Sequence, residues 1–144
     1  MEEEKEIAKA AAKLTYAFAN ATVPKVNVIT GKAFGSAYIT MNSKHIGADM
    51  VFALPNAQIG MMDAGKAVAI MYEEEIKAAD NKSAVIAEKT AEYAALQGSA
   101  ESAARRGYVD NIINPEETRK HLVYAFDMLF TKNEKGPAKK HGTV

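Results

Sequence analysis

Apolar side chains recur at alternating steps of four and three residues over the first part of the chain. This spacing places them on one face of an α-helix, with charged or small residues between them. The pattern predicts a helix over residues 2–21, and a proline three positions further on stops it. The positions on the apolar face are Ile7, Ala11, Leu14, Phe18 and Ala21.

Short apolar runs, broken by glycine, proline and small residues, occupy the middle of the chain. Such runs between turn residues are typical of buried strands. A run of small residues after a glycine turn indicates a further helix. The elements predicted, in order, are a strand at 26–29, a glycine turn at 31–35, a helix over 36–46, a strand at 50–54 and an extended piece at 58–62.

Helical patterns dominate the second half. Asp63 is placed to cap a helix that runs to residue 72. An alanine-rich region then predicts helix with a break near Asp80, followed by a short helix over 99–106 and a strand at 108–113. In the helix that Asp63 is expected to cap, the apolar face comprises Ala67, Val68, Ile70 and Met71.

A clear helix-start signal precedes the last element. Asn114 is expected as the N-cap, Pro115 at the first helical position and Glu117 at the third. Residues 132–144 are polar, with glycine and proline, and predict a loosely held tail. The final helix is expected to turn inward Leu122, Val123, Phe126, Leu129 and Phe130.

The order of these elements predicts an α/β protein with short strands, in a single domain over residues 1–144. The first element is a helix whose apolar face must cover a sheet that begins later. A domain that lacked its opening strands would show this order. We therefore expect an incomplete domain.

Composition excludes several classes of function. The 18 basic and 18 acidic residues give a net charge of zero, so no nucleic-acid partner is expected. The chain has no cysteine, which excludes disulfides and thiolate chemistry and agrees with a cytoplasmic location. Three scattered histidines predict no metal site. No apolar run is long enough to span a membrane, and the acidic N-terminus does not resemble a signal peptide.

Candidate chemistry is concentrated where the first strand passes through a glycine turn into a helix. A helix leaves its first backbone N–H groups without intrahelical acceptors. Gly35, Ser36 and Ala37 carry little side-chain bulk, so a ligand can approach these groups closely. Fixed donors of this kind can stabilise an oxygen that gains negative charge in a transition state. The alternative is that Gly31 and Gly35 serve only the turn.

Other polar residues have structural interpretations. Lys44 and His45 are expected near a helix end at the surface, and Asp49 in a loop. Arg105, Arg106 and Asp110 are expected to form a surface ion pair or a subunit contact.

Three longer strings resemble the C-terminal half of the carboxyltransferase component of biotin-dependent acyl-CoA carboxylases and decarboxylases. They are AKLTYAFANATVPKVNVITGKAFGSAYITMNSKHIGAD from Ala12, ALPNAQIGMMDAGKAV from Ala53 and ARRGYVDNIINPEETRK from Ala104. The C-terminal PAKKHGTV is also similar to the family's ending. The group includes propionyl-CoA carboxylase beta subunits and methylmalonyl-CoA decarboxylase alpha subunits.

The resemblance implies a crotonase-like fold, a spiral of ββα units, of which this chain is an incomplete C-terminal domain. It implies carboxyl transfer between biotin on a carrier protein and the α-carbon of a short acyl-CoA. By position it assigns the oxyanion donors to the backbone N–H groups of Ser36 and Ala37, after Gly35. The residues implied to contact the substrate are Phe34, Tyr38 and Ile39.

Two departures from the family pattern bear on this site. Ser36 stands where the family commonly has a second glycine. Ile39 occupies a position that often carries an aspartate and that influences acyl-group choice, so the pocket here is expected to be more apolar.

Full members contain two crotonase-like domains, so the resemblance implies that the chain needs a companion and is inactive alone. The partners implied are the CoA-binding N-terminal half, a biotin carboxyl carrier protein, biotin carboxylase or decarboxylase membrane subunits, and further copies in an oligomer. One hypothesis is therefore an enzyme component. A second is a non-catalytic assembly module with the same fold. A third, an acyl-CoA hydratase or isomerase, needs a positioned glutamate pair, which is missing beside this turn.

Overall fold

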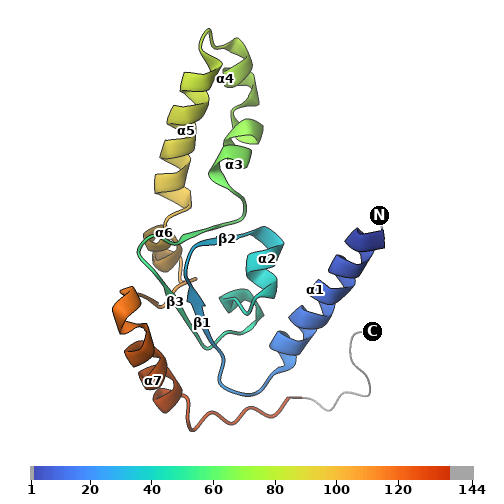
Figure 1. Cartoon of the computed structure of the whole chain (residues 1–144), viewed down its shortest axis with the longest axis vertical. Coiled ribbons are helices and arrows are strands. Elements are labelled where there is room, and N and C mark those ends of the chain that lie inside the picture. The colour runs from blue at the N-terminus through green and yellow to red at the C-terminus, as the bar shows by residue number, and fades with distance from the viewer. Residues whose placement is uncertain (1, 137–144) are drawn as a thin grey trace.

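The computed structural model describes residues 2–136, with side chains from residue 6 onward, and arranges helices around two small parallel sheets (Figure 1). This confirms the α/β class predicted from the order of the apolar runs. Helices α1 and α7 flank the sheets on opposite sides in this view.

The larger sheet has three parallel strands in the order β1–β3–β5. Val28 lies opposite Phe52, and Ile29 lies opposite Ala53. Strand β3 is apolar along its whole length, and β1 is apolar except for Asn27, which is why the sequence pattern predicted them. Their bounds are Val26–Ile29 for β1, Met50–Ala53 for β3 and Asn111–Ile112 for β5.

The smaller sheet corrects one prediction. Residues expected to form only a glycine turn include strand β2 (Lys32–Phe34), which pairs in parallel with β4 (Gln58–Gly60). Ala33 lies opposite Ile59. The local sequence shows a turn, but hydrogen bonds to a strand much later in the chain extend the backbone there.

A strand–strand–helix unit occurs twice in succession. Strands β1 and β2 precede α2 (Gly35–Thr40), and strands β3 and β4 precede α3 (Ala64–Met71). In each unit the first strand joins the larger sheet and the second joins the smaller one. Strand β2 therefore leads directly into α2, where the candidate site lies.

The helix expected over 36–46 is shorter and divided. After α2 the chain turns at Asn42, whose φ is 60°, and then forms a short 3₁₀ helix at Lys44–Ile46. Gly47, with a φ of 91°, ends it in the left-handed conformation that glycine adopts readily.

Helix α1 (Glu2–Asn20) has the predicted bounds within one residue, and it contacts α2. Thr15 Oγ1 lies 3.4 Å from Thr40 Oγ1 at this contact. The apolar face is only partly covered, because Ile7 remains exposed along the free half of the helix.

An arm of three helices extends away from the sheets (Figure 1). It comprises α3, α4 (Glu73–Ala78) and α5 (Lys82–Gln97), with the predicted break between the last two. Asp63 caps α3 as expected, since its Oδ1 accepts a hydrogen bond of 3.1 Å from the Gly65 amide. Of the predicted apolar face of α3, Ala67 and Val68 are buried, whereas Ile70 and Met71 are exposed, because α3 packs along one narrow stripe.

The last helix corrects another prediction. Pro115 opens a 3₁₀ turn (Pro115–Glu117) that leads into α7 (Thr118–Met128), and Asn114 occupies the N-cap position without a side-chain cap bond. Ala125 is the buried residue of α7 and packs with Phe52 and Ile113. At this contact α7 packs on the sheet with the small side chain of Ala125. Three residues expected to face the core are exposed instead: Val123, Phe126 and Phe130.

Between these elements the core is built mainly from small and branched residues. Val51, Ala53 and Ile59 from the strands meet Ala100 and Ala103 of α6 (Ala100–Arg105). Ser99 caps α6 by accepting a 3.1 Å hydrogen bond from the Ser102 amide. This packing holds the first strands and α2 on a rigid base.

An ion pair ties the segment after α7 to the loop before β3. Lys132 Nζ lies 2.8 Å and 2.9 Å from the two carboxylate oxygens of Asp49, and both side chains are largely covered. Asp49 also accepts a 2.7 Å hydrogen bond from the Lys25 amide. Lys132, the first residue of the expected loose tail, is therefore anchored, while residues 137–144 of that tail lie outside the described residues.

We expect Asp49→Asn to lower the free energy of unfolding by about 1–2 kcal/mol, because it weakens charged hydrogen bonds near the solvent boundary. Burial alone would raise the pKa of Asp49, but bonds and charges from Lys132 and Lys25 lower it. The hydrogen bond that Lys132 donates to Asp49 is the main cause that raises the pKa of Lys132. The contribution is thus full at neutral pH. It starts to fall below about pH 4 and is lost as pH passes the lowered pKa of Asp49, and it likewise starts to fall above about pH 10 and is lost as pH passes the raised pKa of Lys132.

Denaturant unfolding of both chains across this pH range measures the difference. Asp127→Asn on the exposed surface of α7 is the matched control, expected to change stability by less than about 0.5 kcal/mol. An Asp49→Asn effect that stays constant down to pH 3 would contradict the assignment.

Candidate active site

The candidate site begins at Gly35, the first residue of α2. Its φ is +60°, a conformation that residues with a Cβ adopt rarely. A Cβ built there would lie 3.1 Å from the backbone oxygen of Met61. The chain that follows β4 lies too close to residue 35 to leave room for a side chain. Glycine is therefore required here by this close approach as well as by the turn.

The backbone amides that follow Gly35 have no side-chain cap. Phe34 is the N-cap residue in an extended conformation, and no side-chain hydrogen bond caps the helix. The first amides of a helix have no acceptor within it. Ser36 and Ala37 are both exposed residues with small side chains.

A groove of about 260 Å³ borders these amides. Ala37, Tyr38 and Met41 of the α2 region line one side of it. The other residues that line it come from β1, β2 and their connection: Asn27, Val28, Ile29, Thr30, Gly31, Lys32, Ala33 and Phe34. Its lining contains no carboxylate, and Lys32 is its one cationic side chain.

The predicted site residues divide between two spaces. Phe34, Ala37 and Tyr38 line the groove, and Gly35 and Ser36 adjoin it in the chain. Ile39 lines a separate, more enclosed cavity, which shares only Tyr38 with the groove. Tyr38 is buried, and burial, together with the nearby Tyr108 hydroxyl, raises the pKa of its phenol.

The charged residues beside the site differ from the expected pairing. Asp110 does not pair with Arg105 or Arg106; its Oδ2 lies 2.8 Å from Lys44 Nζ and accepts a 2.7 Å hydrogen bond from the Val51 amide. Lys44 also donates to the Asp49 carbonyl at 2.9 Å. Lys44 therefore joins the loop that contains Asp49 to the loop that contains Asp110. The sequence could not identify these partners, because the positions of the two loops depend on the tertiary fold.

His45 also has a role that the sequence did not indicate. Its ring lies 5.9 Å from the Tyr38 ring, edge to face, and 4.8 Å from the Tyr108 ring. Aromatic neighbours from three segments thus meet behind α2. The sequence gives no signal of this cluster, because Tyr108 is distant along the chain from the other two residues.

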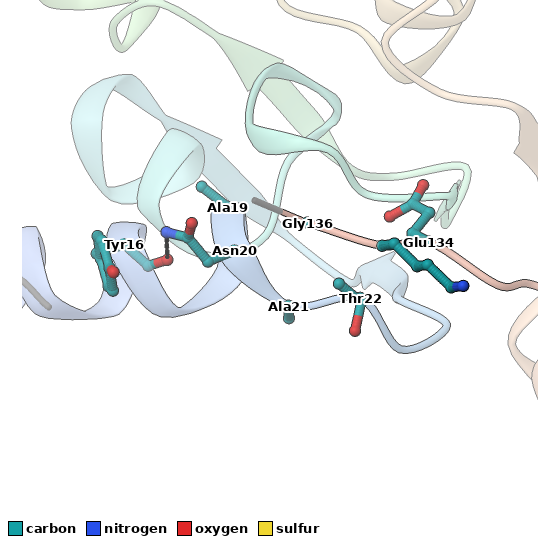
Figure 2. Close-up of a pocket in the computed structure, with 8 residues that line it drawn as sticks. Tyr16, Ala19, Asn20, Ala21, Thr22, Glu134 and Gly136 are labelled. Carbon is teal, nitrogen blue, oxygen red and sulfur yellow. Dashed lines mark hydrogen bonds between the residues drawn. The ribbon is translucent and has the colours of Figure 1, made fainter. Parts of the chain in front are cut away.

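A larger hollow lies elsewhere. It measures about 570 Å³ and is open, between the end of α1 and the segment at 134–136 (Figure 2). In this hollow Asn20 Nδ2 donates a 2.7 Å hydrogen bond to the Tyr16 carbonyl. It shares no residue with the groove beside Ala37 and presents no cluster of groups suited to catalysis.

The described residues contain neither a metal-binding cluster nor a membrane-spanning helix. Within residues 6–136, His, Asp and Glu side chains form no group of three or more that could hold a metal ion. Over the same part of the chain, no helix has the length and apolar character needed to cross a bilayer.

Fold and site together define an α/β domain in which uncapped backbone amides, and no acidic side chain, border a groove. Such a site suits chemistry that places negative charge on an oxygen atom. The chain belongs to the carboxyl transferase domain family, whose pattern matches residues 1–144.

Named relatives agree with this family. The chain is 47% identical over 133 residues to the methylmalonyl-CoA decarboxylase subunit alpha of Propionigenium modestum, with 92% of this chain and 26% of that protein covered. It is 46% identical over 142 residues to the propionyl-CoA carboxylase beta chain of Saccharopolyspora erythraea, with 96% of this chain and 26% of that protein covered. The chain thus spans about a quarter of the length of the curated relatives it matches.

Solved structures show the same similarity. The crystal structure of transcarboxylase 12S, a hexamer assembly with methylmalonyl-coenzyme A and methylmalonic acid bound, matches with a TM-score of 0.92 at 43% identity. That match covers 97% of this chain and 27% of the other. The geranyl-CoA carboxylase beta subunit of P. aeruginosa matches with a TM-score of 0.71 at 25% identity, over 94% of this chain and 28% of the other.

Proposed function

We propose that this chain is a component of a biotin-dependent acyl-CoA carboxyltransferase and that it supplies one oxyanion-binding site. The observation that carries the proposal is the start of α2, where no side chain caps the helix, Ser36 and Ala37 are exposed, and Ala37 lines the groove. Family membership supports it, since relatives carry the names of carboxylases and decarboxylases of acyl-CoA.

The chemistry follows from what the groove contains. When an acyl-CoA loses a proton or a carboxylate from its α-carbon, negative charge collects on the thioester oxygen. Two fixed N–H donors stabilise that oxygen without changing their own protonation. No carboxylate lines the groove, and its one cation, Lys32, lies 3.9 Å from Asp63 Oδ2 in an exposed ion pair.

We propose that Phe34 and Tyr38 contact the substrate in the groove. Ile39 lies behind Tyr38 in the separate cavity, so we expect it to act on the acyl group through its neighbour. Biotin on its carrier protein, when bound, supplies the carboxyl group or accepts it. The same donors fit its ureido oxygen, which also gains charge during transfer.

We further propose that residues 1–144 are part of a C-terminal carboxyltransferase domain with the crotonase-like spiral. The repeated strand–strand–helix unit supports this assignment. The partners are then the CoA-binding N-terminal half, a biotin carboxyl carrier protein, and a biotin carboxylase or decarboxylase membrane subunit, in a homo- or hetero-oligomer located in the cytoplasm. Exposed apolar side chains on α7 and the arm support further protein contacts.

The experiment that tests the proposal is reconstitution. The chain is mixed with the remaining, unmatched part of the Propionigenium modestum relative, and decarboxylation of methylmalonyl-CoA is measured with a biotinylated carrier present. Turnover that requires both parts supports the proposal. A stable complex without turnover would overturn it and favour a non-catalytic assembly module.

A further inference from the structure

Asn27 is the one polar residue of strand β1 and lies on the face of the strand that α2 covers. Successive side chains of a strand point to opposite faces, so Asn27 shares its face with Ile29. Ile29 packs in one cluster with Tyr38 of α2. Asn27 is half-buried, and a polar side chain in such a place is costly unless it is hydrogen-bonded. Its partners therefore indicate its role.

The Asn27 side chain donates two hydrogen bonds to the backbone at the end of α2. Its Nδ2 lies 3.2 Å from the Met41 carbonyl oxygen and 3.1 Å from the Asn42 carbonyl oxygen. A side-chain amide nitrogen carries two hydrogens, so these two acceptors use both of them. Asn27 lines the groove, but no N–H is left to donate to a substrate there, and an amide oxygen would repel a second oxygen that gains negative charge. Any favourable effect of Asn27 on the reaction must therefore pass through α2.

The two bonds from Asn27 hold a sharp turn. Met41 is the C-cap residue of α2, and Asn42 has a φ of 60°, which few residues other than glycine adopt. Such a conformation persists where surrounding contacts hold it. Asn42 is buried, and the buried Ser43 donates a 3.1 Å hydrogen bond from its Oγ to the Ile39 carbonyl. This end of α2 is thus attached both to β1 and to the turn that follows it.

The two ends of α2 are held by different strands. Strand β2, paired with β4, leads into Gly35 at the start, and Asn27 of β1 holds the other end. No side chain caps the start, so these two attachments set the direction of the helix. The N–H groups of a helix run nearly parallel to its axis, and a hydrogen bond weakens as its angle departs from linearity. The direction of α2 therefore determines where the N–H groups of Ser36 and Ala37 point.

We propose that Asn27 is a positioning residue of the carboxyltransferase, which fixes the direction of the oxyanion donors by holding the end of α2 against β1. The inference rests on the function proposed for Ser36 and Ala37. It is carried by the two bonds from Asn27 to the end of α2 and by its place in the wall of the groove that α2 also lines.

Backbone dynamics of the ¹⁵N-labelled chain test this hold without any need for turnover. Asn27→Leu has a similar volume and no donor, and we expect it to lower the N–H order parameters of Ser36 and Ala37 from about 0.85 to below about 0.7. Val51 and Phe52 of β3 should keep values near 0.85, which shows that the sheet is intact. Asn111→Leu is the matched control, because Asn111 is exposed in β5 of the same sheet and its side chain makes no hydrogen bond among the described residues.

Decarboxylation of methylmalonyl-CoA by the reconstituted complex is the second readout, with the assembled fraction taken from native mass. Oxyanion donors act in the transition state, so misdirected donors lower kcat more than they raise KM. We expect Asn27→Leu to lower kcat per assembled complex about tenfold, less than the loss of a whole donor, with KM within about threefold. Asn27→Asp keeps the shape and lacks both donors, so its kcat should fall at least as far. Asn111→Leu should leave both constants within about twofold.

Two results would each overturn the role of Asn27. One is an unchanged order parameter at Ser36 and Ala37 in Asn27→Leu, and the other is a loss of kcat in either Asn27 variant no larger than that in Asn111→Leu. These failures differ from failure of the proposed function. A complex that lacks turnover before any substitution counts against the function itself, whereas turnover that survives both Asn27 variants counts against Asn27 alone.

Discussion

Ala37→Pro is expected to lower turnover of the reconstituted carboxyltransferase by about 100- to 1000-fold, which is the usual cost of removing one oxyanion donor. Proline has no backbone N–H, and residue 37 is in the first turn of α2, where that N–H has no partner within the helix. Steady-state decarboxylation of methylmalonyl-CoA by the reconstituted complex measures the effect.

Ser36→Ala is the control for this result. It changes the side chain and keeps the amide, so we expect turnover within about threefold of the unchanged chain if the donors belong to the backbone. Replacement of Ala37 by lactic acid, which exchanges the N–H for an ester oxygen, removes the donor without the proline ring. Assembly is followed by native mass. Full activity of the lactic acid chain in an intact complex would contradict the role of this amide.

Gly35→Ala is expected to destabilise the chain by about 2–3 kcal/mol and also to reduce turnover. The backbone at Gly35 has a φ of +60°, which costs an alanine about 1–2 kcal/mol, and the new Cβ would press on the Met61 carbonyl. We expect the start of α2 to shift to relieve this contact. The backbone N–H groups of Ser36 and Ala37 would then no longer point at the substrate oxygen. Denaturant unfolding and reconstituted turnover measure the two effects.

Gly31→Ala provides a matched control in the same turn. A Cβ at Gly31 would meet no atom within 4 Å, and its φ is not in the left-handed region. We expect this variant to be neutral or slightly stabilising, because alanine lowers the entropy of the unfolded chain. If both substitutions destabilised the protein equally, the conformation assigned to Gly35 would be wrong.

The sequence predicted the parts of the fold that depend on neighbouring residues. The N-cap at Asp63 and the break between α4 and α5 were both found where local patterns placed them. Strands β1 and β3 were also predicted, since each is a short, mainly apolar run between turn residues. The family strings identified the segment around Gly35 as the candidate site, and this assignment of roles stays a prediction.

Contacts between distant segments were not predictable from local patterns. Strand β2 exists because Lys32–Phe34 pairs with Gln58–Gly60, and its own residues show only a turn. The ion pairs of Asp49 with Lys132 and of Lys44 with Asp110 likewise join loops whose positions depend on the sheet. A hydrogen bond or ion pair stabilises the fold only when its two groups are in contact. The distance between two residues along the sequence does not show whether they are in contact.

The sequence by itself determined the family, the α/β class and the small residues that leave the first amides of α2 accessible. The tertiary structure decided which space each side chain faces: Phe34 lines the groove, Ile39 lines the cavity, and Phe126 faces outward. The physical reason is that helical periodicity specifies which residues share a face. What covers that face depends on packing against elements far away in the chain.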